Sequence, residues 1–204
     1  MYRKTRAYFI KKRTLDLAIC GLVLPLALPV LAICALLVKL TSRGPVLFVQ
    51  ERTGLAGRRF KMLKFRTMVP GAADLKQDLK SRNRIDGPDF KLADDPRITR
   101  IGAFLRKSSL DEAPQLWNVI RGDMSLVGPR PTSFTPDTYE LWHTERLDVM
   151  PGLTGLWQIV GRGDTDFDAR VRLDIAYVRR QSLPLDLSIL LRTVPAVLSR
   201  RGAY

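Results

Sequence analysis

The longest hydrophobic segment of the chain lies near its N-terminus. Residues 17–38, "LAICGLVLPLALPVLAICALLV", contain no charged side chain over 22 positions. About 20 apolar residues cross the core of a bilayer, so this segment is long enough to enter a membrane. It is longer than the apolar part of a secretory signal peptide, and no small-residue cleavage site follows it. The pattern therefore predicts a membrane-embedded helix within a basic N-terminal segment, residues 1–40.

Two features argue against a simple membrane span. Pro25 and Pro29 lie near the middle of the apolar run, and a proline removes a backbone donor and kinks a helix. Lys and Arg residues flank both ends, whereas a spanning helix carries its basic flank mainly on the cytoplasmic side. We expect a re-entrant helix that enters the bilayer, bends at the prolines and returns to the same side. A single span and a buried helix of a soluble protein are the alternatives.

The remaining residues, 41–204, are predicted to form one folded domain. Strand-forming residues at 46–52 and 59–68 flank the turn sequence "TGLAG", a pattern that predicts a β-hairpin. Residues 72–81 fit a short helix that leads into a loop. The fold class that follows is mainly α-helical with a small β-hairpin.

Two amphipathic stretches are candidates for helices at the membrane surface. Residues 97–107 place Ile98, Ile101 and Leu105 on one helical face, with basic side chains around them. Helices of this kind lie on anionic membranes, although a helix packed on the protein surface has the same pattern. Residues 183–201 are apolar with a basic end, and they fit either an interfacial helix or a core helix. The chain is therefore expected to be a membrane-associated protein.

The charge balance indicates an anionic partner. The 204 residues include 34 Lys and Arg against 20 Asp and Glu, which gives a net charge of +14. This excess suits nucleic acid, an acidic membrane surface or a phosphorylated substrate. The sequence shows no reading element or stacking platform of a nucleic-acid-binding module, so we expect no nucleic acid partner. One histidine and two cysteines provide neither a zinc-ligand spacing nor a disulfide framework.

The tandem carboxylates Asp111 and Glu112 are the strongest candidates for chemistry. Ser109 and Glu112 form an S-x-x-E capping box at a predicted helix start, so helix capping alone would explain the pair. The surroundings allow a second interpretation, because free amides at a helix start bind phosphate and Arg106 and Arg130 lie on either side in the sequence. Carboxylates with nearby arginines can form a Mg²⁺–diphosphate site, in which a carboxylate can also attack phosphorus.

Several long segments, in this order, carry a resemblance to a known family. The segments are "TSRGPVLFVQERTG" (41–54), "FKMLKFRTM" (60–68), "DDPRITRIGAFLRKSSLDEAPQLWNVIRGDMSLVGPRP" (94–131), "PGLTGLWQIVGR" (151–162) and "LDLSILLRTVPAVLSRRGAY" (185–204). They resemble the bacterial sugar transferases, the monotopic phosphoglycosyl transferases that start glycan assembly on polyprenyl phosphate. The resemblance covers nearly the whole chain. Its last two segments are similar to the branch that makes exopolysaccharides and often transfers a hexose phosphate.

The resemblance implies a reaction, a location and partners. A UDP-sugar would give its sugar 1-phosphate to polyprenyl (undecaprenyl) phosphate, and UMP would leave. The enzyme would work at the cytoplasmic face of the bacterial inner membrane, in contact with membrane lipids, with a homo-oligomer as an open option. Members of this branch often carry an added N-terminal membrane region, so this sequence is expected to hold the catalytic part alone.

Residue roles follow from the same resemblance. Asp111 is similar to the nucleophile that takes the phosphosugar covalently. Glu112 is similar to its partner, which would bind Mg²⁺ together with Asp111 and set the charge state of the site. The candidates for binding the diphosphate or the lipid phosphate are Arg106, Arg130, Lys64 and Arg66 in "KFRTM", and Arg162 in "QIVGR".

Two other functions stay open at this point. A glycosyltransferase would move only the sugar and release UDP, with the carboxylates as metal ligands. A non-catalytic protein would bind an anionic membrane surface through its charge alone. Outside the motifs, His143 is expected on a helix surface, because a lone histidine without metal-ligand spacing does not indicate a site. Asp174 fits either contact with a nucleotide or pairing with Arg170 or Arg172 on a helix surface.

Overall fold

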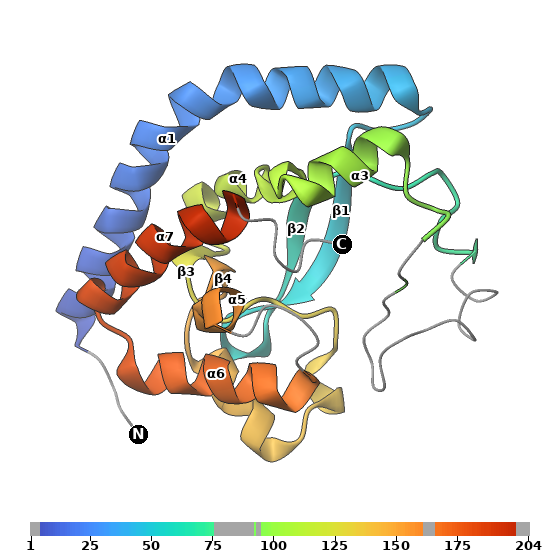
Figure 1. The fold of residues 1–204 in the computed structure, drawn as a ribbon. Helices are drawn as coiled ribbons and strands as arrows, with labels where there is room; N and C mark the ends of the chain where they lie inside the picture. Colours follow the sequence, from blue (N-terminus) through green and yellow to red (C-terminus); the bar gives the residue numbers. More distant parts are fainter. Residues whose placement is uncertain (1–4, 76–91, 93–94, 161–165, 199–204) are drawn as a thin grey trace.

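A long bent helix wraps around a body of shorter helices and strands in the computed structural model of the chain (Figure 1). The structure describes residues 5–75, 92, 95–160 and 166–198. In chain order the α-helices and strands are α1 (Arg6–Thr41), β1 (Leu47–Thr53), β2 (Arg59–Phe65), α3 (Arg100–Lys107), α4 (Gln115–Arg121), β3 (Ser125–Val127), β4 (Gly152–Thr154), α5 (Leu156–Val160), α6 (Phe167–Arg180) and α7 (Leu183–Leu198). Short 3₁₀ helices between them are η1 (Leu55–Gly57), η3 (Leu110–Glu112), η4 (Pro136–Thr138) and η5 (Leu141–Asp148).

Helix α1 contains the predicted apolar segment and bends near its middle, where Pro25 and Pro29 lie (Figure 1). In the described part of the chain it is the one helix that is long and apolar enough to cross a membrane. Most of its apolar stretch is exposed, whereas the core helix of a soluble protein would be mostly buried. The alternative of a buried soluble helix is therefore not supported.

Both halves of α1 pack against the same body. In the first half, Cys20 belongs to a core cluster that includes Met62 of β2 and Val119 of α4. In the second half, Cys34 and Val38 belong to another cluster, with Phe65 at the end of β2 and Leu105 of α3. The exposed apolar side chains lie mainly between these contacts and include Leu22, Val23, Leu26, Leu28 and Val30. The bend thus projects an apolar surface away from the body.

Polar contacts fix the first half of α1. Lys12 Nζ lies 2.7 Å from Asp186 Oδ2 of α7, and both side chains are almost fully buried. The hydroxyl of Tyr177, from α6, donates to the other oxygen of Asp186 at 2.7 Å. One turn further along α1, Asp16 accepts a hydrogen bond from Ser125 Oγ of β3 at 2.7 Å. These side chains replace water as partners for each other, so α1 is held to α6, α7 and β3 at once.

The predicted hairpin is confirmed, and a second strand pair accompanies it. Strands β1 and β2 run antiparallel, with Leu47 opposite Phe65 and Thr53 opposite Arg59. The "TGLAG" turn contains η1, and Ala56 adopts a left-handed conformation within it, with φ 52°. The sequence did not predict the parallel pair of β3 and β4, whose strands are three residues each. Strands this short show too little alternation for a local pattern to reveal them.

The helices predicted at 97–107 and 183–201 are confirmed in type. Helix α3 begins at Arg100 rather than residue 97. The Thr99 side chain accepts a hydrogen bond from the Gly102 backbone amide and so caps the start of the helix. Helix α7 is also present. It buries Ile189 and exposes Leu187 and Leu191, so it contributes to the core and also shows an apolar outer face. The predicted helix at 72–81 lies mostly outside the described residues.

We predict that Lys12→Met lowers the free energy of unfolding by about 3–5 kcal/mol, because it leaves the buried charge of Asp186 without its ion pair. The double variant Lys12→Met/Asp186→Leu should recover most of this loss. Chemical unfolding of the detergent-held protein measures both effects. Lys11→Met is the matched control, since the adjacent Lys11 is exposed. Equal stability of Lys12→Met and Lys11→Met would contradict the structural importance of the buried pair.

Candidate functional site

The tandem carboxylates lie on a single turn between two helices. Asp111 and Glu112 belong to η3, which follows α3 and precedes α4. Ser109 has a left-handed backbone, with φ 58° and ψ 13°, and its side chain makes no capping hydrogen bond. The capping box predicted for Ser109 and Glu112 is therefore wrong, and α4 begins only at Gln115. The physical reason is that charged side chains bind the Glu112 carboxylate, and such bonds are stronger than one to a backbone amide.

Glu112 joins three separate segments of the chain. Lys64 Nζ, from β2, lies 2.7 Å from Glu112 Oε1. Arg130, in the segment after β3, donates from Nη1 to Oε2 at 2.9 Å and from Nη2 to Oε1. The Glu112 side chain is 18% exposed as a result. The structure thus brings together Lys64, Glu112 and Arg130, three of the predicted site residues.

The two adjacent carboxyl groups experience opposite electrostatic environments. Burial, followed by the charge of Glu112, raises the pKa of Asp111 to about 6. Burial also disfavours the ionised form of Glu112, but Arg130 and Lys64 hold the pKa of its carboxyl well below the usual range. Among the described residues, no hydrogen bond or ion pair occupies the Asp111 carboxylate. Asp111 is therefore the group available to a ligand, and neighbouring carboxyl groups with pKa values shifted apart are typical of catalytic sites.

Arg106 reaches the site from the last turn of α3. Its Nε donates to Thr67 Oγ1 at 2.9 Å, and its positive charge favours the ionised form of Asp111. Helix α3 lies this close because Gly102 faces the backbone of Thr67. A Cβ at Gly102 would lie 2.0 Å from the Thr67 carbonyl oxygen. Any side chain at this position would displace the helix, and Arg106 with it.

The structure gives Arg66 a different set of contacts from the predicted one. Its guanidinium donates to the carbonyl oxygens of Arg43 at 2.7 Å and Ser42 at 2.8 Å. Arg66 therefore stabilises the end of α1 and is not brought into the cluster around Glu112. The remaining candidate, Arg162, lies outside the described residues.

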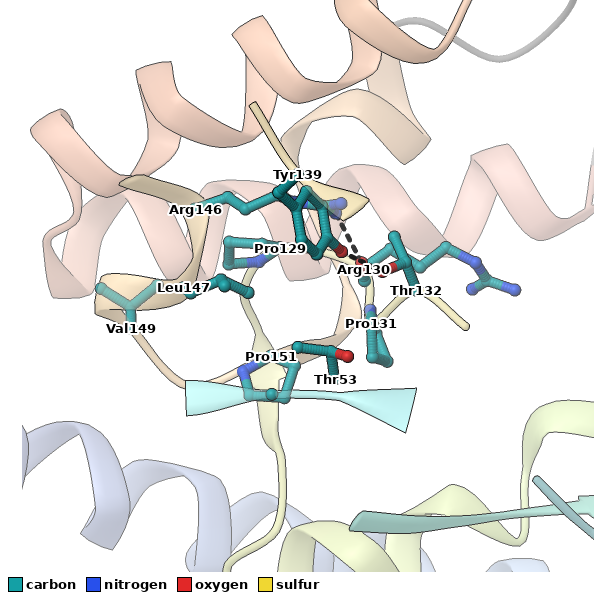
Figure 2. A pocket seen from close by; sticks show the side chains of 11 residues that line it. Thr53, Pro129, Arg130, Pro131, Thr132, Tyr139, Arg146, Leu147, Val149 and Pro151 are labelled. Carbon is teal, nitrogen blue, oxygen red and sulfur yellow. Dashed lines mark hydrogen bonds between the residues drawn. The ribbon is translucent and has the colours of Figure 1, made fainter. Parts of the chain in front are cut away.

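Arg146 fixes the backbone of Arg130, a role that the sequence did not reveal. Its Nη2 donates to the carbonyl oxygen of Arg130 at 2.6 Å (Figure 2) and to Asp174 Oδ2 at 2.5 Å. Pro129 and Pro131 restrict the backbone on both sides of Arg130. The position of the Arg130 guanidinium therefore depends on a chain of contacts that begins on η5 and α6. The one sign of this arrangement in the sequence is the Pro-Arg-Pro motif around Arg130.

Two interpretations of the sequence need correction. Asp174 is 1% exposed and pairs with Arg146, rather than with Arg170 or Arg172 on a helix surface. His143 is also buried, and its ring packs edge-on against Phe167, 5.3 Å between ring centroids. The contacts of Asp174 with Arg146 and of His143 with Phe167 each join residues more than 20 positions apart, which a local helical pattern does not encode.

The carboxylates fit a shared Mg²⁺ site only in part. The described residues contain no group of three or more His, Cys, Asp or Glu side chains that could hold a metal ion. Both oxygens of Glu112 are bound by Lys64 and Arg130. Mg²⁺ needs only one or two carboxylates where substrate phosphates complete its shell. Asp111 fits that requirement, whereas Glu112 directs no free oxygen toward a metal.

We predict that the pKa of Asp111, about 6, falls in Glu112→Gln, because the substitution removes the neighbouring negative charge that raises it and keeps the positive charges of Lys64 and Arg130 in the chain. Infrared titration of the carboxyl groups measures this shift. The difference between spectra with and without Asp111→Asn isolates Asp111 from Asp174, whose pKa burial also raises to about 6. An unchanged or higher pKa in Glu112→Gln would show that the two charges do not interact.

Comparisons with known proteins show which family the chain is similar to. A family model described as bacterial sugar transferase matches residues 7–200. The UDP-galactose-lipid carrier transferase of Erwinia amylovora is 46% identical over 199 residues, which cover 95% of this chain and 41% of that protein. The UDP-glucose:undecaprenyl-phosphate glucose-1-phosphate transferase of Caulobacter vibrioides is 44% identical over 206 residues, 96% of this chain and 72% of that protein.

Coverage differs among the relatives. The exopolysaccharide production protein ExoY of Sinorhizobium fredii is 43% identical over 202 residues, which cover 96% of this chain and 88% of that protein. By contrast, the chain spans less than half the length of several relatives, as with the Erwinia protein. The family match takes in almost all of α1, both strand pairs and the residues around Glu112. The chain therefore belongs to the bacterial sugar transferase family.

Proposed function

We propose that this protein transfers a sugar 1-phosphate from a UDP-sugar to polyprenyl (undecaprenyl) phosphate and releases UMP, as a first membrane step of exopolysaccharide assembly. The observation that carries the proposal is the contrast between adjacent carboxylates. Glu112 is bound by Lys64 and Arg130, while Asp111 is partly buried, free of hydrogen bonds among the described residues, and stabilised by three nearby cations. The names of the Erwinia and Caulobacter relatives specify a UDP-sugar and a lipid acceptor, which supports the same reaction.

In the proposed first step, an oxygen of ionised Asp111 attacks the phosphorus that carries the sugar. A bond forms between this oxygen and the phosphorus, and the bond to the bridging oxygen breaks, so UMP leaves with the electron pair. With a pKa of about 6, Asp111 is mostly ionised at neutral pH and needs no separate base. Lys64, Arg106 and Arg130 provide fixed positive charge for the phosphoryl oxygens as charge shifts toward the leaving group.

In the proposed second step, an oxygen of the lipid phosphate attacks the same phosphorus. The bond to Asp111 breaks, the carboxylate is restored, and a lipid diphosphate sugar is formed. Glu112 stays ionised in both steps because its two cationic partners stabilise its charge. Its role is to hold Lys64 and Arg130 in position next to Asp111. When bound by Asp111 and the diphosphate, Mg²⁺ would neutralise charge on the leaving UMP.

The two other functions make different demands on the site. A glycosyltransferase that moves the sugar alone would release UDP and would use Asp111 only as a metal ligand. A protein that binds membranes through its charge would have no need of a buried carboxyl group, whose desolvation is unfavourable. Neither alternative explains why Asp111, which has no hydrogen bond or ion pair among the described residues, lies next to Glu112, which is bound by both Lys64 and Arg130.

We also propose that α1 is re-entrant, with residues 1–40 as the membrane segment and 41–204 as the catalytic part at the cytoplasmic face of the inner membrane. Both halves of α1 contact one folded body, and a body on one side of a bilayer requires both ends of the helix on that side. The exposed face of α7, with Leu187, Leu191 and Val194, would rest on the membrane surface, as would Phe104 of α3.

We predict that Asp111→Asn lowers turnover at least about a thousandfold, since it removes the nucleophile. The assay measures the nucleotide released from UDP-hexoses by nanodisc-held protein with Mg²⁺ and undecaprenyl phosphate. Mass spectrometry of the intact protein, incubated with donor alone, should show a hexose phosphate adduct that Asp111→Asn lacks. Asp148→Asn is the matched control, because Asp148 is exposed at the end of η5. Full turnover in Asp111→Asn, or release of UDP, would overturn the mechanism.

The topology makes a separate prediction. Single-cysteine variants at Thr5 and Arg43, in a chain whose Cys20 and Cys34 are replaced by Ala, should both react with a membrane-impermeant thiol reagent from the cytoplasmic side. Both positions are exposed at the ends of α1. Labelling of the two positions from opposite sides of the membrane would indicate a single span.

A further inference from the structure

We infer that a hollow beside Arg130 binds the nucleoside monophosphate half of the donor, and that Trp157 and Arg170 determine its affinity. This inference rests on the proposed function and adds to it a subsite. The hollow is open to solvent and has a volume of about 100 Å³. It is lined by Arg52, Arg130, Pro131, Thr132, Arg146, Trp157, Phe167, Arg170 and Val171.

The wall of the hollow carries several arginines, of which Arg130 and Arg146 are already paired with carboxylates. All charged side chains among its described lining residues are arginines, contributed by β1, the segment after β3, η5 and α6. Arg52 donates to the Pro131 carbonyl oxygen at 3.4 Å and to Gln50 Oε1 at 2.6 Å, so its guanidinium is held against the segment that carries Arg130. Guanidinium groups arranged in this way suit phosphate, which accepts their hydrogen bonds in pairs.

Aromatic rings form the other part of the wall. The guanidinium carbon of Arg170 lies 5.6 Å from the ring centroid of Trp157, which keeps the two side chains together. The ring of Phe167 is fixed by edge contacts with Phe134 and His143, at 5.4 and 5.3 Å between centroids. Aromatic faces beside arginines are the combination that binds a nucleobase and its phosphate together.

Arg130 connects the hollow to the reacting group. It lines the hollow and also binds Glu112, the residue next to Asp111. A donor whose nucleoside lies on Trp157 and Phe167 therefore directs its diphosphate past Arg130 toward Asp111. In this arrangement the first phosphate, which leaves with UMP, stays in the hollow, and the sugar lies beyond the second. The hollow thus selects the nucleotide and leaves the choice of sugar to other residues.

The chain contains a matched pair of the same chemistry outside the hollow. Arg172, two residues after Arg170 on α6, lies over the ring of Trp142 at 5.1 Å. Neither residue lines the hollow. Substitutions of Trp142 and Arg172 therefore serve as controls. They remove the same kind of tryptophan–arginine contact at a place outside the hollow, where no nucleotide is proposed to bind.

The experiment measures UMP binding to the full chain in nanodiscs by calorimetry, together with KM for the UDP-sugar and for undecaprenyl phosphate. Trp157→Ala and Arg170→Gln should each weaken UMP binding about tenfold or more and raise KM for the donor in parallel. KM for the lipid phosphate should stay unchanged. Trp157→Phe keeps an aromatic face and should retain most of the affinity. Trp142→Ala and Arg172→Gln should bind UMP like the wild type.

The outcomes separate the subsite from the reaction. Unchanged UMP affinity in Trp157→Ala and Arg170→Gln, or no UMP binding to the wild type, would overturn the subsite even if transfer proceeds. Equal losses in the Trp142 and Arg172 controls would also overturn it, because they would show a general effect on folding. UMP binding that depends on Trp157, in a protein that transfers no phosphosugar, would support the subsite while the proposed reaction fails.

Discussion

The ion pairs of Glu112 with Lys64 and Arg130 are the contacts on which the site depends. They bring β2, η3 and the segment after β3 to one point, although these segments lie 48 and 18 residues apart in the sequence. They also resolve the apparent conflict of two neighbouring negative charges. Because Glu112 takes both cations as direct partners, Asp111 remains accessible and more easily protonated than an exposed aspartate. A tandem Asp-Glu sequence thus yields one carboxylate that is bound by two cations and one that has no hydrogen bond or ion pair among the described residues.

Long elements and continuous motifs were predictable from the sequence. The 22-residue uncharged run predicted the long helix, and the strand residues around "TGLAG" predicted the hairpin, since both patterns are local and extend over many positions. The carboxylate pair and Arg130 were found because they are close in sequence to a recognisable motif. Lys64 is the exception, since its place beside Glu112 rests on the resemblance and not on local pattern.

Contacts between distant residues were not predictable in the same way. The buried pair of Arg146 and Asp174, 28 residues apart, gives no signal in either helix. Arg66 belongs to the same "KFRTM" motif as Lys64, yet it lies just beyond the end of β2, and its guanidinium binds the end of α1. The capping box failed for a related reason, because the carboxylate of Glu112 had tertiary partners that bind it more strongly than a local amide.

The bend of α1 has a consequence for the membrane itself. In the proposed re-entrant topology, α1 would add area to the leaflet that it enters and little to the opposite one. Such a wedge would favour membrane that bulges toward the side on which the folded body lies, as interfacial amphipathic helices do. Because both halves of α1 are fixed to a rigid body, by Lys12 and Asp16 on one side and by Cys34 and Val38 on the other, the wedge keeps its shape. Local curvature and lipid packing would then influence where in the membrane the protein resides.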